Sequence, residues 1–247
     1  MIRRFAKYGA VVALAAGAAP AAASGPPPGR LAPVHGTYAP TIDPARFIRT
    51  IDNPYLPYLP GTTIRFRGQV DGAAQTDVEV VLHSTRRILG VRTTIVRDTV
   101  FAHGTPIERT DDYYAQDRDG NVWYMGEDAF DRVHGRFAKA PDSWLGGVHG
   151  AEPGIIMPAH PRVGDRYRQE YYPPGKALDE GRVIRTGGHR TVPAGSYDGV
   201  LVTAERSPAE PAVERKYYVR GVGEIADRLV KGGHESFQLV RVTRARR

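Results

Sequence analysis

The fold is decided by residues 63–83, which read TIRFRGQVDGAAQTDVEVVLH. In the first half, Ile64 and Phe66 alternate with arginines, and a turn-forming Asp-Gly pair follows. The second half alternates between two faces, with Val78, Val80 and Leu82 on one and Asp77 and Glu79 on the other. Because side chains point to opposite faces along a strand, this period of two predicts two strands joined by a tight antiparallel turn.

The same alternation continues toward the C-terminus, with short turn signals between the segments. The segments read VRTTIVRDTVF, IERTDDYYAQ, NVWYMGED, DRYRQEYY, RVIRTGGHRTV, YDGVLVTAER, ERKYYVRG and SFQLVRVTR. No stretch has the length and period of a helix that could connect parallel strands. We therefore predict an all-β fold of roughly ten strands, an antiparallel meander that curls into an open or closed barrel.

Three regions are expected along the chain. Residues 1–24 combine a basic start, an apolar stretch too short to span a membrane and small residues at its end, which is typical of a cleaved signal peptide. Residues 25–41 are rich in proline and glycine and are expected to form a tether. Residues 42–247 are expected to form a single barrel-like domain.

One short helix is predicted at the start of this domain. Asp43 is a suitable N-cap and Pro44 a suitable first helical residue, with Phe47 and Ile51 on one helix face. A proline after Asn53 ends this segment.

Composition limits the classes of function. The chain has no cysteine, which excludes disulfides, thiolate nucleophiles and thiolate metal sites. The formal net charge of +7 includes three basic residues of the signal segment, so the remainder carries +4. This excess is small and dispersed, so we expect no nucleic-acid partner, although an anionic glycan or lipid headgroup fits the sign of the charge. A periplasmic or secreted protein without a membrane span is expected.

Two motifs mimic ligand sites but favour turns. Residues 220–226, RGVGEIA, have the glycine spacing of a dinucleotide-binding loop, yet a strand follows where that loop needs a helix. Residues 117–121, DRDGN, place oxygen atoms as a calcium loop does, with Asp128 at the twelfth position. Val122 stands where the loop needs glycine, so a hairpin turn at Asp119-Gly120 is favoured.

Neither a metal nor a cofactor is predicted. His149, Glu152 and His160 have the donor chemistry of a zinc or copper site, but prolines between them make this a loop without a shared face. No serine stands in the context of an activated nucleophile. If the protein is an enzyme, Glu127 and Glu170 are the best acid and base for a glycoside-type reaction.

Three predicted strands carry a tyrosine pair after a charged residue: Asp112-Tyr113-Tyr114, Glu170-Tyr171-Tyr172 and Lys216-Tyr217-Tyr218. Each charge shares a face with the second tyrosine of its pair. Tyrosine suits a wall that is apolar with a polar tip, but strand propensity alone also enriches this residue.

Five segments together resemble a family of uncharacterised exported bacterial proteins. They read NPYLPYLPGTTIRFRG, DDYYAQDRDGNVWYMGED, EPGIIMPAHPRVGDRYRQEYYPPG, VPAGSYDGVLVTAE and KYYVRGVGEI, within about residues 52–227. The last two are also similar to parts of exported half-barrels of the lipoprotein-carrier (LolA-like) kind, which implies a sheet around a cavity for an acyl chain. The chain departs from the family pattern at the doubled proline of YYPPG and at His160.

The segment PGIIMP is interpreted as a loop or short strand at the rim of the curled sheet, with the strand VGDRYRQEYY entering from it. The predicted wall of the concavity consists of Trp123, Tyr124, Glu127, Met157, Arg168, Glu170, Tyr172 and Tyr218. The first functional hypothesis is an exported soluble protein that binds a small amphipathic or lipid-like molecule. The alternatives are a secreted hydrolase or lyase acting on a carbohydrate or other polymer, and an accessory protein that meets envelope components through a strand edge.

Overall fold

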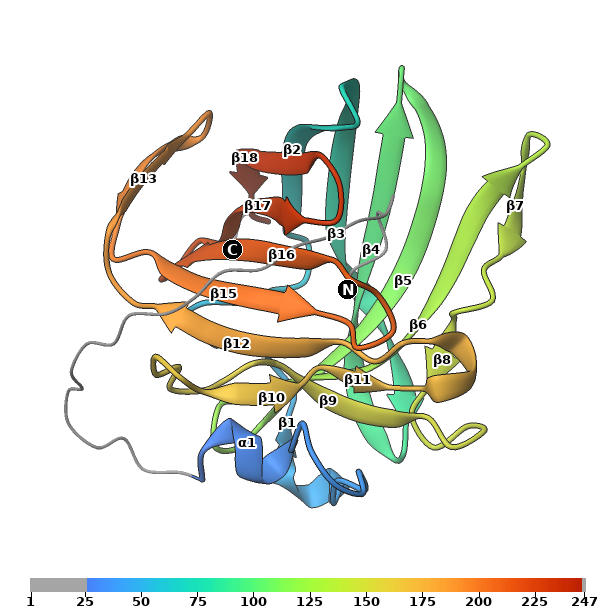
Figure 1. Cartoon of the computed structure of the whole chain (residues 1–247). Coiled ribbons are helices and arrows are strands. Elements are labelled where there is room, and N and C mark those ends of the chain that lie inside the picture. The colour runs from blue at the N-terminus through green and yellow to red at the C-terminus, as the bar shows by residue number, and fades with distance from the viewer. Residues whose placement is uncertain (1–25, 246–247) are drawn as a thin grey trace.

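The computed structural model describes residues 26–245, so the predicted signal peptide lies outside the described residues. Nearly every described element is an antiparallel strand (Figure 1). The helical elements are α1 (Pro28–Leu31), η1 (Pro44–Arg46) and η2 (Pro173–Gly175). The strands are β1 (Phe47–Ile48), β2 (Thr63–Val70), β3 (Ala73–Ile88), β4 (Val91–Ala102), β5 (Thr105–Asp117), β6 (Val122–Val133), β7 (Arg136–Lys139), β8 (Trp144–Leu145), β9 (Glu152–Met157), β10 (Arg166–Arg168), β11 (Glu170–Tyr171), β12 (Glu180–Arg185), β13 (His189–Val192), β14 (Gly195–Asp198), β15 (Leu201–Arg206), β16 (Val213–Val219), β17 (Gly223–Lys231) and β18 (Glu235–Thr243).

The sheet is a curled antiparallel meander, which confirms the predicted fold class. Its strand order is β10-β12-β15-β16-β17-β18-β2-β3-β4-β5-β6-β9-β11, and β13 and β14 form a separate hairpin. The turn between β2 and β3 is the one predicted, since Asp71 and Gly72 have positive φ angles of 48° and 83°. β18 pairs with β2, so the last strand of the chain lies beside the first long one.

The two ends of this strand order meet because β10 and β11 are consecutive in the chain. The strand predicted to run through VGDRYRQEYY breaks at Gln169, whose backbone N–H bonds to the carbonyl of Asp179. β10 pairs with β12, whereas β11 pairs with β9 on the other side. Gly154 of β9 lies directly against this break, where a Cβ would come within 2.4 Å of the Arg168 carbonyl oxygen.

The interior face of β3 is the acidic one. Phe66 of β2 is buried and is the direct cross-strand partner of Asp77, so the two side chains share a face. Val78 and Val80 lie on the outer face and are half-buried. The predicted strand is confirmed, but its carboxylates point into the barrel.

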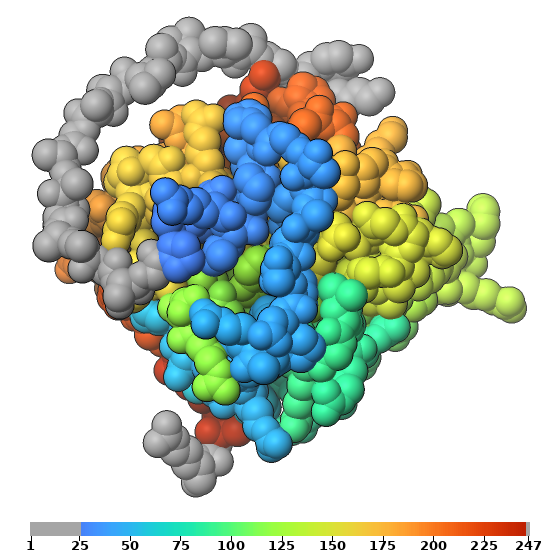
Figure 2. Space-filling model, turned by 90° about the horizontal axis from the view of Figure 1, so that it is seen from below, coloured from blue at the N-terminus to red at the C-terminus, as the bar shows by residue number. Residues whose placement is uncertain are grey.

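The segment expected to be a tether instead lies against the sheet. Figure 2 shows it in blue across one end of the molecule, over yellow and green strands. Ala32 and Tyr38 are buried, and the Tyr38 hydroxyl donates a hydrogen bond to the Pro153 carbonyl at 2.5 Å. The expected helix at residues 43–51 is a single 3-10 turn, capped by Asp43 as predicted, after which the chain becomes strand β1.

Within residues 26–245, no helix has both the length and the apolar composition of a membrane span.

Candidate functional site

Carboxylates line much of the barrel interior. On the β3–β6 side, Glu79 is the cross-strand partner of Asp98, and Asp112 is the partner of Glu127. On the opposite side, Lys216 is the cross-strand partner of Asp227. The interior also carries Asp77, Glu205, Glu214, Glu224 and Glu235. Buried carboxylates in this number need charged or hydrogen-bonding partners around them.

Aromatic rings stack along the inner wall beside these carboxylates. Tyr58 packs on Tyr114 at 5.1 Å between ring centroids, and Tyr114 stacks on Tyr124 at 5.0 Å. Tyr124 then meets Trp144 edge to face at 5.3 Å. The sequence predicted the shared face of Asp112 and Tyr114, and the register confirms it.

Two hydrogen bonds connect the end of this aromatic stack to the two glutamates predicted as an acid–base pair. The Tyr124 hydroxyl lies 2.9 Å from Glu127 Oε2 and 2.7 Å from Asp112 Oδ1. The Trp144 indole N–H donates to Glu170 Oε2 at 2.9 Å. Because Glu127 and Trp144 are cross-strand partners, both glutamates belong to one local structure.

Glu127 and Glu170 line the same cavity, whose volume is about 230 Å³. Five acidic residues and one lysine supply its ionisable groups, and Pro141 and Ala177 are apolar parts of its wall. The charged lining residues are Glu127, Asp142, Glu170, Asp179, Glu210 and Lys176. We call this feature the acidic cavity.

Burial and neighbouring charges raise the pKa of two acidic side chains in this cavity. Burial, together with the carboxylates of Asp179 and Glu127, raises the pKa of Glu170 from 4.5 to about 8, against the opposing effect of the Trp144 hydrogen bond. Glu170 therefore holds its proton at neutral pH. Burial likewise raises the pKa of Glu210, again with a contribution from Asp179.

The raised pKa of Glu170 predicts a specific pH dependence of stability. Because the folded-state pKa lies above the unfolded value, Glu170 contributes stability that is full below pH 4.5 and is lost as the pH rises through about 8. The variant Glu170→Gln cannot ionise, so its melting temperature relative to the native protein should rise between pH 5 and pH 9 (about the window of the two pKa values). Asp131→Asn, at an exposed position, is the control. If the difference in melting temperature between Glu170→Gln and the native protein did not change with pH, Glu170 would not be protonated through burial as inferred.

The predicted wall residues do not all meet at the acidic cavity. Glu127 and Glu170 line the cavity, Tyr124 lies behind the wall and bonds Glu127, and the ring of Tyr172 packs against Gly175 of the cavity wall. Tyr218 is buried in the interior on β16, where burial raises its pKa and Glu205 and Glu224 raise it further.

Trp123, Met157 and Arg168, the other three predicted wall residues, lie away from the acidic cavity. Trp123 points away from Tyr124, packs on Phe47 and donates to Asp117 Oδ2 at 2.9 Å. Met157 is fully buried in β9 beside Val122. Arg168 lies on the outer face under the N-terminal segment, because the break at Gln169 shifts the alternation that would have placed it with Glu170.

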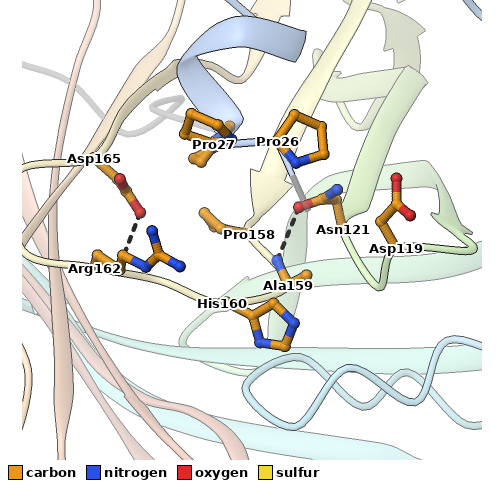
Figure 3. A pocket seen from close by; sticks show the side chains of 10 residues that line it. Pro26, Pro27, Asp119, Asn121, Pro158, Ala159, His160, Arg162 and Asp165 are labelled. Carbon is orange, nitrogen blue, oxygen red and sulfur yellow. Dashed lines mark hydrogen bonds between the residues drawn. The ribbon is translucent and has the colours of Figure 1, made fainter. Parts of the chain in front are cut away.

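Residues 117–121 form the predicted hairpin turn. The Asp117 carboxylate accepts hydrogen bonds from the Asn121 backbone, the Asn121 side chain and Trp123. Figure 3 shows the adjacent pocket, lined by Asp119, Asn121 and His160 among others. Its volume is about 20 Å³, which is room for about one water molecule. We therefore do not assign a ligand site there.

Sequence reasoning missed Asp142, Lys176, Asp179 and Glu210 of the acidic cavity. All four lie in connecting segments outside the named strands, so no alternation pattern identifies their direction.

The sequence matches no protein-family model, and no curated protein matches it significantly. Among solved structures, it is similar to a "putative exported protein with YmcC-like fold" from Bacteroides fragilis NCTC 9343, with 14% identity over 77% of this chain and 99% of that one, at a TM-score of 0.45. It is also similar to a "putative lipoprotein" from Parabacteroides distasonis ATCC 8503, with 12% identity over 76% of this chain and 98% of that one, at a TM-score of 0.40. Likeness at this level assigns neither family nor function, and the resemblance to lipoprotein carriers stays a prediction.

Proposed function

We propose that this chain is an exported binding protein that holds a small amphipathic molecule through a cationic group in the acidic cavity. The observation that carries the proposal is the composition of the cavity, where five carboxylates and one lysine surround about 230 Å³. Export rests on the signal-like sequence of residues 1–24.

Charge decides which amphipathic molecules fit. A carboxylate or phosphate headgroup placed between Glu127 and Asp179 would meet like charges in a partly desolvated space. An ammonium group would instead donate up to three hydrogen bonds to these acceptors. The acidic cavity therefore supports an amine ligand more than the free acyl chain that the lipoprotein-carrier resemblance implies.

Protonation links Glu170 to such a ligand. A bound cation favours the ionised form of Glu170, so binding should release a proton at pH values below about 8. Affinity should consequently rise with pH across this range. The apolar part of the ligand would contact Pro141 and Ala177, which belong to the cavity wall.

Octylamine and octanoate provide a matched test, since they share a chain and differ in the charge of the headgroup. Calorimetric titration should show binding of octylamine that strengthens from pH 6 to pH 8.5 and releases protons, and little binding of octanoate. Glu127→Gln and Asp179→Asn should each weaken octylamine binding about tenfold by removing one charge-assisted hydrogen bond. Asp198→Asn, at a side chain that is 89% exposed, is the control. Equal affinity for the two probes would overturn the proposal.

A second function is favoured by the protonation state of Glu170. A glutamate that keeps its proton at neutral pH, in one cavity with a second carboxylate, is the pattern of a general acid and its partner in glycoside cleavage. In this alternative, Glu170 is the acid and Glu127 the base or nucleophile. A panel of nitrophenyl glycosides tests it, because Glu170→Gln should abolish any turnover while leaving octylamine binding measurable.

A further inference from the structure

Four arginines form a row across the outer face of the sheet. The register pairs Arg166 with Arg182, Arg182 with Ala204, Ala204 with Arg215, and Arg215 with Arg228. Direct cross-strand partners share a face, so all five side chains point the same way. The strands β17, β16, β15, β12 and β10 lie one below another in Figure 1, and at ordinary strand spacing the row is about 19 Å long.

This face is the one opposite the acidic interior. Lys216, next to Arg215 in β16, points into the barrel toward Glu205 and Glu214. Arg166, Arg215 and Arg228 are exposed and Arg182 is half-buried. The row therefore presents its charge to solvent, separated from the acidic interior by the sheet.

None of the four guanidinium groups forms an ion pair or a side-chain hydrogen bond with another residue in the part of the chain that the structure describes. Glu180, an acid on the same face, is already engaged, since it accepts from Arg206 at 2.9 Å and lies 4.0 Å from Arg168. Like charges on directly opposite residues destabilise a sheet. The row is thus a concentration of positive charge that the described residues do not neutralise.

One end of the row is recessed. A groove of about 210 Å³ is lined by three arginines (Arg166, Arg182 and Arg206) and two glutamates (Glu180 and Glu205), and Val34 of the N-terminal segment is also part of its wall. The Nε atom of Arg182 is buried there and has no partner. Near the other end of the row, the β13–β14 hairpin places Arg190 over the outward-facing ring of Tyr217, 3.8 Å from its centroid.

We propose that this row binds a linear polyanion, such as an acidic polysaccharide, laid across the strands with its anionic groups on Arg166, Arg182, Arg215 and Arg228. The guanidinium fork matches sulfate, phosphate and carboxylate groups through paired hydrogen bonds. A chain-like ligand fits because the charges follow a line and the groove admits single groups. A flat lipid surface fits less well than a chain. Val34 and the β13–β14 hairpin flank the row of arginines and would hinder the close approach of a flat membrane.

Dextran sulfate is the probe, with neutral dextran, free sulfate and phosphatidylglycerol vesicles as comparisons. Binding of dextran sulfate should weaken as salt is added, and Arg166→Gln/Arg182→Gln and Arg215→Gln/Arg228→Gln should each weaken it about tenfold or more. The double variant Arg132→Gln/Arg136→Gln removes two exposed charges from the β6–β7 hairpin and should change binding less than about twofold.

Thermal unfolding separates binding from folding in these variants. Removing like charges that face one another should leave the melting temperature unchanged or raise it, so weaker binding cannot come from a damaged sheet. Octylamine binding should be unaffected, which makes this proposal independent of the acidic cavity. Tighter binding to vesicles than to dextran sulfate, equal binding of free sulfate at matched concentration, or equal loss in the control variant would each overturn it.

Discussion

Replacing Gly154 with alanine is expected to lower the free energy of unfolding by about 3 kcal/mol, because overpacking against backbone cannot be relieved by a side-chain movement. A Cβ at this position would come within 2.4 Å of the Arg168 carbonyl oxygen and the Gln169 carbonyl carbon. These atoms belong to the break between β10 and β11, where the two ends of the sheet order meet. The variant would have to separate β9 from this junction, and so open the barrel next to the strand that carries Glu170.

Urea unfolding monitored by tryptophan fluorescence measures this effect. Gly104→Ala is the matched control, since a Cβ there meets nothing within 4 Å and the cost is only that of the positive φ angle, about 1 kcal/mol. Gly154 carries no such backbone strain, so its larger cost would come from packing alone. Similar losses in the two variants would show that β9 can move away from the junction, and that the barrel is not held closed there.

Local pattern identifies strands and turns in this chain but not the side of the sheet that becomes the interior. The alternation of residues 63–83 and the Asp71-Gly72 turn predict β2, β3 and their hairpin, and the structure contains them. The interior face of β3 is set by the register with Phe66, a contact between strands that hydrophobic periodicity within β3 does not encode. The valine face is the more apolar one in sequence, yet Asp77 is the inward residue.

The candidate site shows the same limit. Charge and tyrosine alternation correctly places Asp112 with Tyr114 and Lys216 with Tyr218, because these pairs lie within continuous strands. It fails at Arg168, since the backbone leaves one strand pair and joins another at Gln169. The pairing of β18 with β2 joins segments from the two ends of the domain, and no local signal specifies it.

Loss of the Lys216 charge is expected to destabilise the fold by about 3–5 kcal/mol at pH 7, the usual cost of leaving a buried charge without its partner. The Lys216 ammonium lies 3.4 Å from Glu205 Oε2 and 3.8 Å from Glu214 Oε2, and the Glu205 side chain is 0% exposed. Lys216→Met keeps the length of the side chain and removes the charge. Lys139→Met is the control, because Lys139 bonds Asp128 at 2.7 Å with 57% of its side chain exposed, and such surface pairs contribute below about 1 kcal/mol.

The loss should depend on pH with a definite sign. Burial would raise the pKa of Glu205, but Lys216 reverses this and holds it below the usual 4.5. In the native protein, Glu205 thus contributes stability above pH 4.5 that is lost as the pH falls through its folded-state pKa. In Lys216→Met, burial becomes the dominant influence on Glu205, so its folded-state pKa rises above its unfolded value. The contribution of Glu205 to the free energy of unfolding is then lost as the pH rises.

The difference in free energy of unfolding between Lys216→Met and the native protein should therefore be small near pH 4. It should grow toward pH 8, because the buried carboxylate ionises over this range. Adding Glu205→Gln to Lys216→Met should recover much of the loss, because the buried group then carries no charge. Equilibrium unfolding of the two single variants and the double variant gives the coupling energy directly. If the loss were the same at both pH values and the double variant were no more stable than Lys216→Met, Lys216 would act by packing, and the acidic interior would not depend on it for charge.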